Sequence, residues 1–213
     1  QIFRSSSQRQ KYMPGPKSNT YSEGGSVNED YYAFTWGNAL FIVLNIMTYT
    51  PTRHELGVFP GVPDDWTLGK EQFAWFEKTL SEAYSKWRIV FIHHVAGGNA
   101  GDFNNAAYGR GGGRAAYVGE QARIHELMRR HEVKILFYGH DHVFTDMVVD
   151  GIHYTLPGSA GAPWKFDSSI TSYPEGTYYQ DSGHGRVEVF SNRILVSFLG
   201  LGNTELHRFT VYP

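Results

Sequence analysis

The stretch FYGHDHVF, residues 137–144, places two histidines at the end of an apolar segment. The segment just before it, VKIL (133–136), is short, continuous and mostly apolar or β-branched, and it predicts a buried strand. A glycine breaks this strand, and His140, Asp141 and His142 follow at once. Two imidazoles and a carboxylate at the end of a core strand indicate a chemical site.

A second predicted strand ends in the same way. The segment RIVFIH (88–93) is again mostly apolar, and His93 and His94 stand at its carboxyl end. A helical pattern over residues 119–131 separates it from the 133–138 strand. In α/β sheets, ligands bind outside the carboxyl ends of the strands, so both histidine groups should face one site.

The chemistry of these side chains points to a metal. Residues i and i+2 of an extended chain point the same way, so His140 and His142 can face one site while Asp141 faces away. Imidazole nitrogen suits zinc, iron and manganese-class ions. One such histidine pair is weak evidence by itself, because most histidines are structural or surface residues. A strand ending in HH followed by a strand ending in GHDH is much harder to obtain by chance.

Length and composition describe an ordinary globular protein. The 213 residues are enough for a substantial core, with 41% hydrophobic and 19% charged side chains. The net charge of −2 offers no basic field for nucleic acid, and no apolar run reaches the ~18–20 residues of a membrane helix. The lack of cysteine excludes disulfides, thiolate metal sites and cysteine nucleophiles.

Periodicity predicts helices alternating with strands in the first part of the chain. Strands over 31–36 and 39–47 are joined by a Gly37-Asn38 hairpin turn. Residues 68–87 have the helical period, with Thr67 as the N-cap. The apolar face of that helix would consist of Phe73, Phe76, Leu80, Ala83 and Trp87.

Strands dominate about the last 70 residues. The segments VFTDMVV and IHYTL flank an Asp150-Gly151 turn, and GRVEVF and RILVSFLG flank Ser191-Asn192. A last strand, LHRFTVY, closes the chain. The predicted class is therefore α/β feeding into an antiparallel sheet.

These motifs resemble a known family, the calcineurin-like metallophosphoesterases, which include the purple acid phosphatases. The resemblance covers roughly residues 30–165 and depends on four segments: YYAFTWGNALFIVLN (31–45), EQFAWFEKTL (71–80), KWRIVFIHH (86–94) and ILFYGHDH (135–142). It implies an αββα sandwich and a phosphoesterase with two divalent or trivalent metal ions of the Fe, Zn or Mn class. By position, His93 and His140 would bind one metal and His142 the other, with His94 as the catalytic, substrate-facing residue beside them.

The chain departs from the family pattern at its N-terminal side. The first three family motifs (DxH, GD and GNH followed by an acid) should precede residue 31, and none is present. They carry the bridging carboxylate and further aspartate and asparagine ligands. The HxP after the fourth motif is HHVAGG here, and Asn45 stands where many relatives have aspartate. We therefore expect residues 1–30 to be a polar lead-in and 31–213 to be the C-terminal portion of the domain. The N-terminal half would be absent from this chain and supplied as a partner, as a separate chain for example.

Two kinds of residue outside the histidine motifs keep alternative interpretations. Arg110 and Arg114, in a glycine-rich loop over 96–113, could clamp a phosphate bidentately or belong to a solvated loop. Asp102 and Asp146 could be metal ligands, but we expect them to be surface or turn carboxylates. The remaining histidines have no partner pattern and are expected to be structural: His54, His125, His131, His153, His184 and His207.

The leading functional hypothesis is hydrolysis of a phosphate ester at a dinuclear metal centre. The alternative is a non-catalytic metal-binding or interaction module that has lost the carboxylate ligands, and a purely structural fragment is third. The expected partners are a phosphate-ester substrate and the N-terminal half of the domain, without membrane or nucleic acid. The sequence leaves the location open, and the resemblance alone favours a secreted or periplasmic one.

Overall fold

A mixed sheet of seven strands forms the centre of the computed structural model, which describes residues 8–45, 68–93, 120–139, 142–159 and 176–213. The strands of this large sheet lie in the order β1-β2-β3-β4-β6-β5-β7. Their bounds are β1 Tyr32–Trp36, β2 Ala39–Leu44, β3 Trp87–Ile92, β4 Ile135–Phe137, β5 Phe144–Val149, β6 Ile152–Pro157 and β7 Gly176–Tyr179.

The four central strands, β2, β3, β4 and β6, run parallel. Strands β1, β5 and β7 are antiparallel to their neighbours. The parallel strands therefore end at the same edge of the sheet, which we call the carboxyl edge.

A second, small sheet packs on one face of the large sheet. It contains β8 (Gly183–Val189), β9 (Ile194–Gly200) and β10 (Glu205–Val211) in the antiparallel order β10-β9-β8, with a 3-10 turn η2 (Leu201–Asn203) before β10. The interface between the sheets is a hydrophobic cluster that includes Trp87, Phe144, Phe198 and Phe209.

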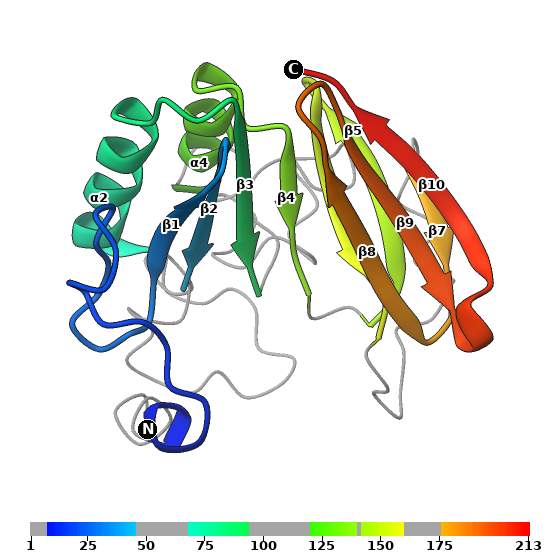
Figure 1. Cartoon of the computed structure of the whole chain (residues 1–213), viewed down its shortest axis with the longest axis horizontal. Helices are drawn as coiled ribbons and strands as arrows, with labels where there is room; N and C mark the ends of the chain where they lie inside the picture. Colours follow the sequence, from blue (N-terminus) through cyan, green and yellow to red (C-terminus); the bar gives the residue numbers. More distant parts are fainter. Residues whose placement is uncertain (1–7, 46–67, 94–119, 140–141, 160–175) are drawn as a thin grey trace.

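The helices cover the opposite face. Helices α2 (Gly69–Ser81) and α4 (Glu120–Arg130) share a second hydrophobic cluster with the large sheet, which includes Phe76, Ile124 and Leu136. Figure 1 shows the two helices on one side of the strands and β8, β9 and β10 on the other. The order of layers is thus helix, large sheet, small sheet.

The mixed α/β class is observed, with two packed sheets as expected. Within the described ranges no helix covers the outer face of the small sheet, so these residues form three layers of the predicted αββα sandwich. Among the described residues, no helix is long and apolar enough to cross a membrane.

The predicted hairpins are confirmed. Strands β1 and β2 pair around Gly37-Asn38, and β8 and β9 pair around Ser191-Asn192. Asp150 and Gly151 both take positive φ, 49° and 80°, as the tight turn between β5 and β6 requires.

The predicted helix over 68–87 is too long. Helix α2 ends at Ser81, and Trp87 begins β3, where it pairs with Ala39 and is fully buried between the sheets. Its backbone N–H donates to the carbonyl of Asn38, 3.1 Å away. The N-cap is Leu68 and not Thr67, which lies outside the described residues, and it makes no side-chain capping bond.

One further strand differs from the sequence-based prediction. Strand β7, with the sequence GTYY, was not predicted and pairs with β5. At the other end of the sheet, Trp36 ends β1 at the hairpin and is 78% exposed.

Candidate functional site

The first histidine motif lies at the carboxyl edge. His93 directly follows β3 and is exposed. The last paired residues of β2 and β3 are Leu44 and Ile92, so the next residue of each strand, Asn45 and His93, stand side by side. Neighbouring strands lie about 4.8 Å apart, which places the two residues within reach of one ligand.

The second histidine motif begins on the other side of His93. The backbone N–H of Gly139 donates to the carbonyl of His93 at 2.9 Å, which extends the β3–β4 pairing beyond both strands. A Cβ on residue 139 would lie 3.2 Å from Nδ1 and 3.4 Å from the carbonyl oxygen of His93. A side chain here would crowd the imidazole, so glycine lets His93 lie close against the backbone of residue 139.

An open hollow of about 470 Å³ adjoins His93. Val43, Phe91 and Phe137 line it from the large sheet, and Gly185 and Val187 line it from β8. The rings of Phe91 and Phe137 stack there with centroids 5.1 Å apart. The hollow is mostly apolar, and His93 supplies an imidazole at its margin. Such a cavity with a few polar groups is the usual form of a ligand site.

His142 lies at the same edge, farther along the sheet. It precedes β5 by two residues, and the first residue of β5, Phe144, pairs with the last residue of β6, Pro157. His142 is half-buried and has φ 55°, so its backbone is left-handed. The alternation argument for an extended His140-Asp141-His142 segment therefore does not apply at His142.

The other residues assigned from the sequence lie outside the described residues. These are His94, Asp102, Arg110, Arg114 and His140. Within the described ranges, no group of three or more His, Asp or Glu side chains is arranged to hold a metal ion.

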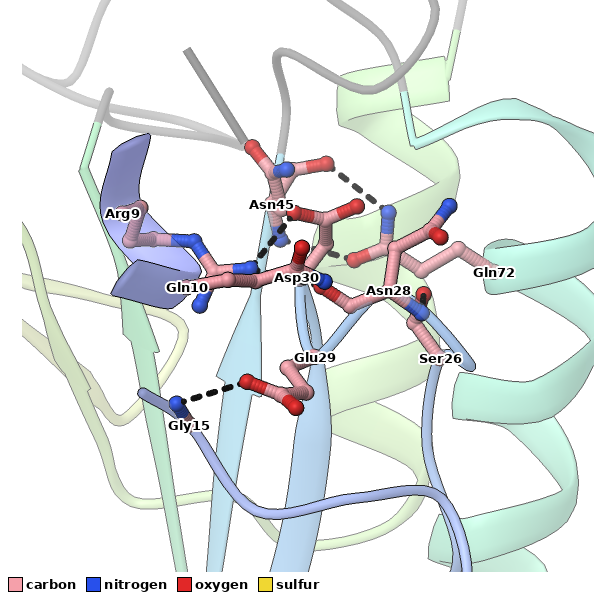
Figure 2. A network of polar contacts seen from close by, with 9 residues as sticks. All are labelled: Arg9, Gln10, Gly15, Ser26, Asn28, Glu29, Asp30, Asn45 and Gln72. Carbon is pink, nitrogen blue, oxygen red and sulfur yellow. Dashed lines mark hydrogen bonds and ion pairs between the residues drawn. The ribbon is translucent and has the colours of Figure 1, made fainter. Parts of the chain in front are cut away.

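A polar network borders His93 on the side of β2, and the sequence-based reasoning missed it. Gln72 of α2 is buried, and its Oε1 accepts from the Asn45 N–H at 2.7 Å while its Nε2 donates to the Asn45 carbonyl at 2.8 Å. Asp30 precedes β1 by two residues, and the Nη2 of Arg9 donates to the Oδ1 of Asp30 at 3.0 Å. Figure 2 shows these four side chains gathered in one place. The hairpin about Gly37-Asn38 already brings residues 30 and 45 to the same end of β1 and β2, which is the signal that could have found them.

The lead-in is bonded to the same region. Arg9 and Gln10 both donate to the carbonyl of Asn28, at 2.6 and 2.8 Å, and the carboxylate of Glu29 accepts from the N–H of Gly15. The indole of Trp75 on α2 donates to the carbonyl of Glu23 at 2.9 Å. The described part of the lead-in, residues 8–30, thus packs against the helix and the first hairpin (Figure 2).

Asp146 corrects an expectation from the sequence. It was expected at the surface or in a turn, but it lies inside β5 and is 8% exposed. Its carboxylate contacts Nδ1 of His153 at 2.9 Å and Nε2 of His207 at 3.3 Å, and it accepts from the Thr155 hydroxyl at 3.1 Å. The ring of His153 stacks on Phe209, with centroids 4.3 Å apart. These contacts join the two sheets, so the structural interpretation of His153 and His207 agrees with the geometry.

Two other histidines lie away from the carboxyl edge. The ring of His125 contacts the Tyr154 hydroxyl through Nδ1 at 2.6 Å and Asp150 through Nε2 at 3.0 Å. His131 follows α4, before β4 begins, and therefore lies at the opposite edge. Burial, together with the charges of Arg88 and Arg130, lowers the pKa of His131.

Comparison with known proteins finds similarity in structure alone. No family model matches the chain, and no curated protein matches it in sequence. A purple acid phosphatase, PPD1 from yellow lupin (Lupinus luteus) seeds, is similar with a TM-score of 0.62 at 15% identity over 92% of this chain. PhoD is similar with a TM-score of 0.63 at 18% identity over 95% of the chain. GAP50, the anchor in the inner membrane complex of Plasmodium, gives 0.55 at 16% over 85%.

These similarities show the fold. The chain shares the architecture of a purple acid phosphatase and of PhoD, at identities too low to carry over any activity. It spans 35% of the phosphatase chain, 44% of PhoD and 53% of GAP50. It therefore corresponds to about a third to a half of the solved chains that it resembles.

Proposed function

We propose that this chain contributes the histidine side of a dinuclear metal site that hydrolyses phosphate esters. In this proposal His93 and His140 hold one ion of the Fe, Zn or Mn class and His142 holds the other. The observation that carries it is the position of His93. It is exposed at the carboxyl edge, at the margin of the hollow, beside the glycine that begins the GHDH motif. The shared fold with a purple acid phosphatase and PhoD supports it.

The described residues fit such a site in part. Imidazole is a suitable donor for these ions, and Gly139 leaves room for the His93 ring to turn toward one. A pair of bound metal ions would supply charge neutralisation for the phosphoryl oxygens and acidify bound water. His93 would hold its ion from β3, and His142 would hold the other from the start of β5.

Further roles are proposed for residues outside the described ranges. His94 would face the substrate beside the metal ligand. Arg110 and Arg114 would bind the phosphate, because guanidinium matches its oxygens bidentately. Replacing Arg110 with alanine should then raise KM more than it lowers the metal content.

The site as proposed needs carboxylates from another segment. Three neutral imidazoles leave the charge of two metal ions uncompensated. We propose a carboxylate-bearing segment that pairs with β8 and covers the hollow. Within the described chain, β8 pairs with β9 alone, and the apolar rings of Phe91 and Phe137 face the hollow beside it. An unpaired strand edge next to an open apolar face favours strand addition.

Metal content and hydrolysis of p-nitrophenyl phosphate test the proposal together. We expect His93→Ala to lose most of the bound manganese or zinc, while His131→Ala, at the opposite edge, retains it. The chain by itself should be nearly inactive and should gain activity beside a segment with aspartate and asparagine ligands. Equal metal content in wild type and His93→Ala would contradict the site. Full activity of a chain beginning at Gln1 would contradict the need for a second segment.

A second candidate is a non-catalytic metal-binding or interaction module. One of the similar structures, GAP50, is described as an anchor in a membrane complex, so this fold also occurs in a protein with that role. The two candidates differ in the assay: the module would bind metal through His93 and remain inactive with the added segment.

A further inference from the structure

Gln72 is a buried polar side chain in the helix-facing core. Two of the three hydrogen bonds of its side-chain amide are made to one residue, Asn45. Gln72 is 1% exposed on α2 and bonds to both backbone groups of Asn45, with a third contact from Nε2 to the Leu68 carbonyl at 3.3 Å. Burying an amide is favourable only when its hydrogen bonds are made. The Gln72 amide therefore pairs with the backbone N–H and carbonyl of Asn45, as the backbone of a neighbouring strand would.

The residue that Gln72 holds is the one beside His93. The β2–β3 register, continued by one residue, aligns Asn45 with His93, and Asp30, which precedes β1 by two residues, belongs to the polar network around Asn45 in Figure 2. A row of polar residues, Asp30, Asn45 and His93, thus runs across three neighbouring chain segments at the carboxyl edge. Arg9 is ion-paired with Asp30 at the end of this row (Figure 2).

Alternation along β2 indicates the side of the sheet on which Asn45 lies. Ile42 and Leu44 are buried in the helix-facing cluster, whereas Ala39 and Phe41 belong to the cluster between the sheets. Asn45 is four residues beyond Phe41 and half-buried, so alternation places its side chain on the same face, toward the small sheet and the hollow. A carboxamide in that place can donate a hydrogen bond to an oxyanion bound beside His93.

We propose that the Asn45 carboxamide contacts the phosphoryl group of a bound phosphate ester, and that Gln72 is the residue that positions it. This inference rests on the proposed phosphoesterase function and adds a substrate contact from β2. Gln72 fixes both backbone groups of Asn45, so the carboxamide starts from a set backbone position beside His93, which would hold a metal ion. Preorganised donors of this kind contribute because little reordering is needed when the ligand binds.

The test uses inorganic phosphate as the probe on the intact chain loaded with Mn²⁺. Electron paramagnetic resonance of free Mn²⁺ gives the metal affinity, and Mn²⁺-induced relaxation of the ³¹P signal gives the phosphate affinity. We expect Asn45→Ala to leave Mn²⁺ affinity within about twofold and to weaken phosphate binding about tenfold or more, since a bond to a charged group is lost. Gln72→Leu should weaken phosphate binding similarly.

A double substitution separates positioning from general stability. If Gln72 acts through Asn45, Gln72→Leu should have less than about a twofold effect on phosphate affinity in the Asn45→Ala background, although it still lowers the melting temperature. Gln72→Glu is the matched control, because it retains the bond from the Asn45 N–H and should lose less affinity than Gln72→Leu.

Three results would overturn the inference, and they point to different causes. Phosphate affinity unchanged in Asn45→Ala, with Mn²⁺ bound, would overturn the substrate contact and leave the proposed function standing. A full effect of Gln72→Leu in the Asn45→Ala background would make Gln72 a structural residue only. A wild-type chain that binds no Mn²⁺ would overturn both this inference and the proposed function.

Discussion

The two ends of the interface between the sheets differ in how they are filled. At β5 and β6, Phe144, Phe198 and Phe209 pack closely, and Asp146 is bonded across to His207 of β10. At the carboxyl ends of β2, β3 and β4, the same face of the large sheet borders a hollow beside β8. The filled end stabilises the fold, and the hollow end is where a ligand or a further strand can enter. Stability and function are thus expected from opposite ends of one interface.

Two phenylalanines test this contrast with the largest expected effect. Phe198 is fully buried and its ring contacts the ring of Phe144, whereas Phe91 is half-buried at the hollow. Phe198→Ala should lower the free energy of unfolding by about 3–5 kcal/mol, because it leaves a cavity in a packed region. Phe91→Ala should cost only about 1–2 kcal/mol, because part of its surface already faces open space. Urea denaturation measures both, and equal losses would mean that the two ends are packed alike.

Substitutions of Asp146 and His93 should also differ in their effect on stability, by a smaller amount. Asp146→Ala should cost about 2–4 kcal/mol, because the rings of His153 and His207 lose their contacts with the carboxylate, and the Thr155 hydroxyl loses the shorter of its two bonds. Asp146→Asn, which keeps the shape and one accepting oxygen, should cost less. His93→Ala should change stability by less than about 0.5 kcal/mol, because the side chain is exposed. A large loss of stability in His93→Ala would make this residue a structural one.

The smallest expected effect is the contribution of His131 to the pH dependence of stability. Burial lowers its pKa in the folded state below the ordinary value, so the folded protein binds fewer protons than the unfolded chain in that range. Stability from this group is therefore present above the ordinary histidine pKa and falls as the pH drops from there toward the lowered pKa. His131→Gln should reduce the drop in melting temperature between pH 7 and pH 5. An unchanged drop would show that groups other than His131 dominate the pH dependence.

Local signals explain which parts of the fold the sequence predicts. The turn residues Gly37-Asn38 and Asp150-Gly151 determine the β1–β2 and β5–β6 hairpins, and such a signal lies within a few consecutive residues. Both hairpins were therefore predicted correctly. The helical spacing, in contrast, continues by coincidence from Leu80 through Ala83 to Trp87. Only the pairing of Trp87 with Ala39, which is distant in sequence, shows that it belongs to a strand.

Long-range packing explains what the sequence does not reveal. Asp146 is buried because the small sheet, formed by residues 183–211, covers β5. The sequence around Asp146 does not predict that a second sheet will cover its strand. The register of β2 with β3 brings Asn45 beside His93, and neither residue type predicts this neighbour. The histidines at the ends of strands, by contrast, follow from a local pattern.

The proposed function requires that the carboxyl edge near His93 binds metal. Nuclear magnetic resonance of the histidine ring protons tests this requirement, during titration with less than one equivalent of Mn²⁺ and with signals assigned by single substitutions. We expect the signals of His93 and His142 to broaden first, while those of His125, His131 and His153 stay sharp. Broadening that begins at His131 or His153, or that leaves His93 unaffected, would contradict it.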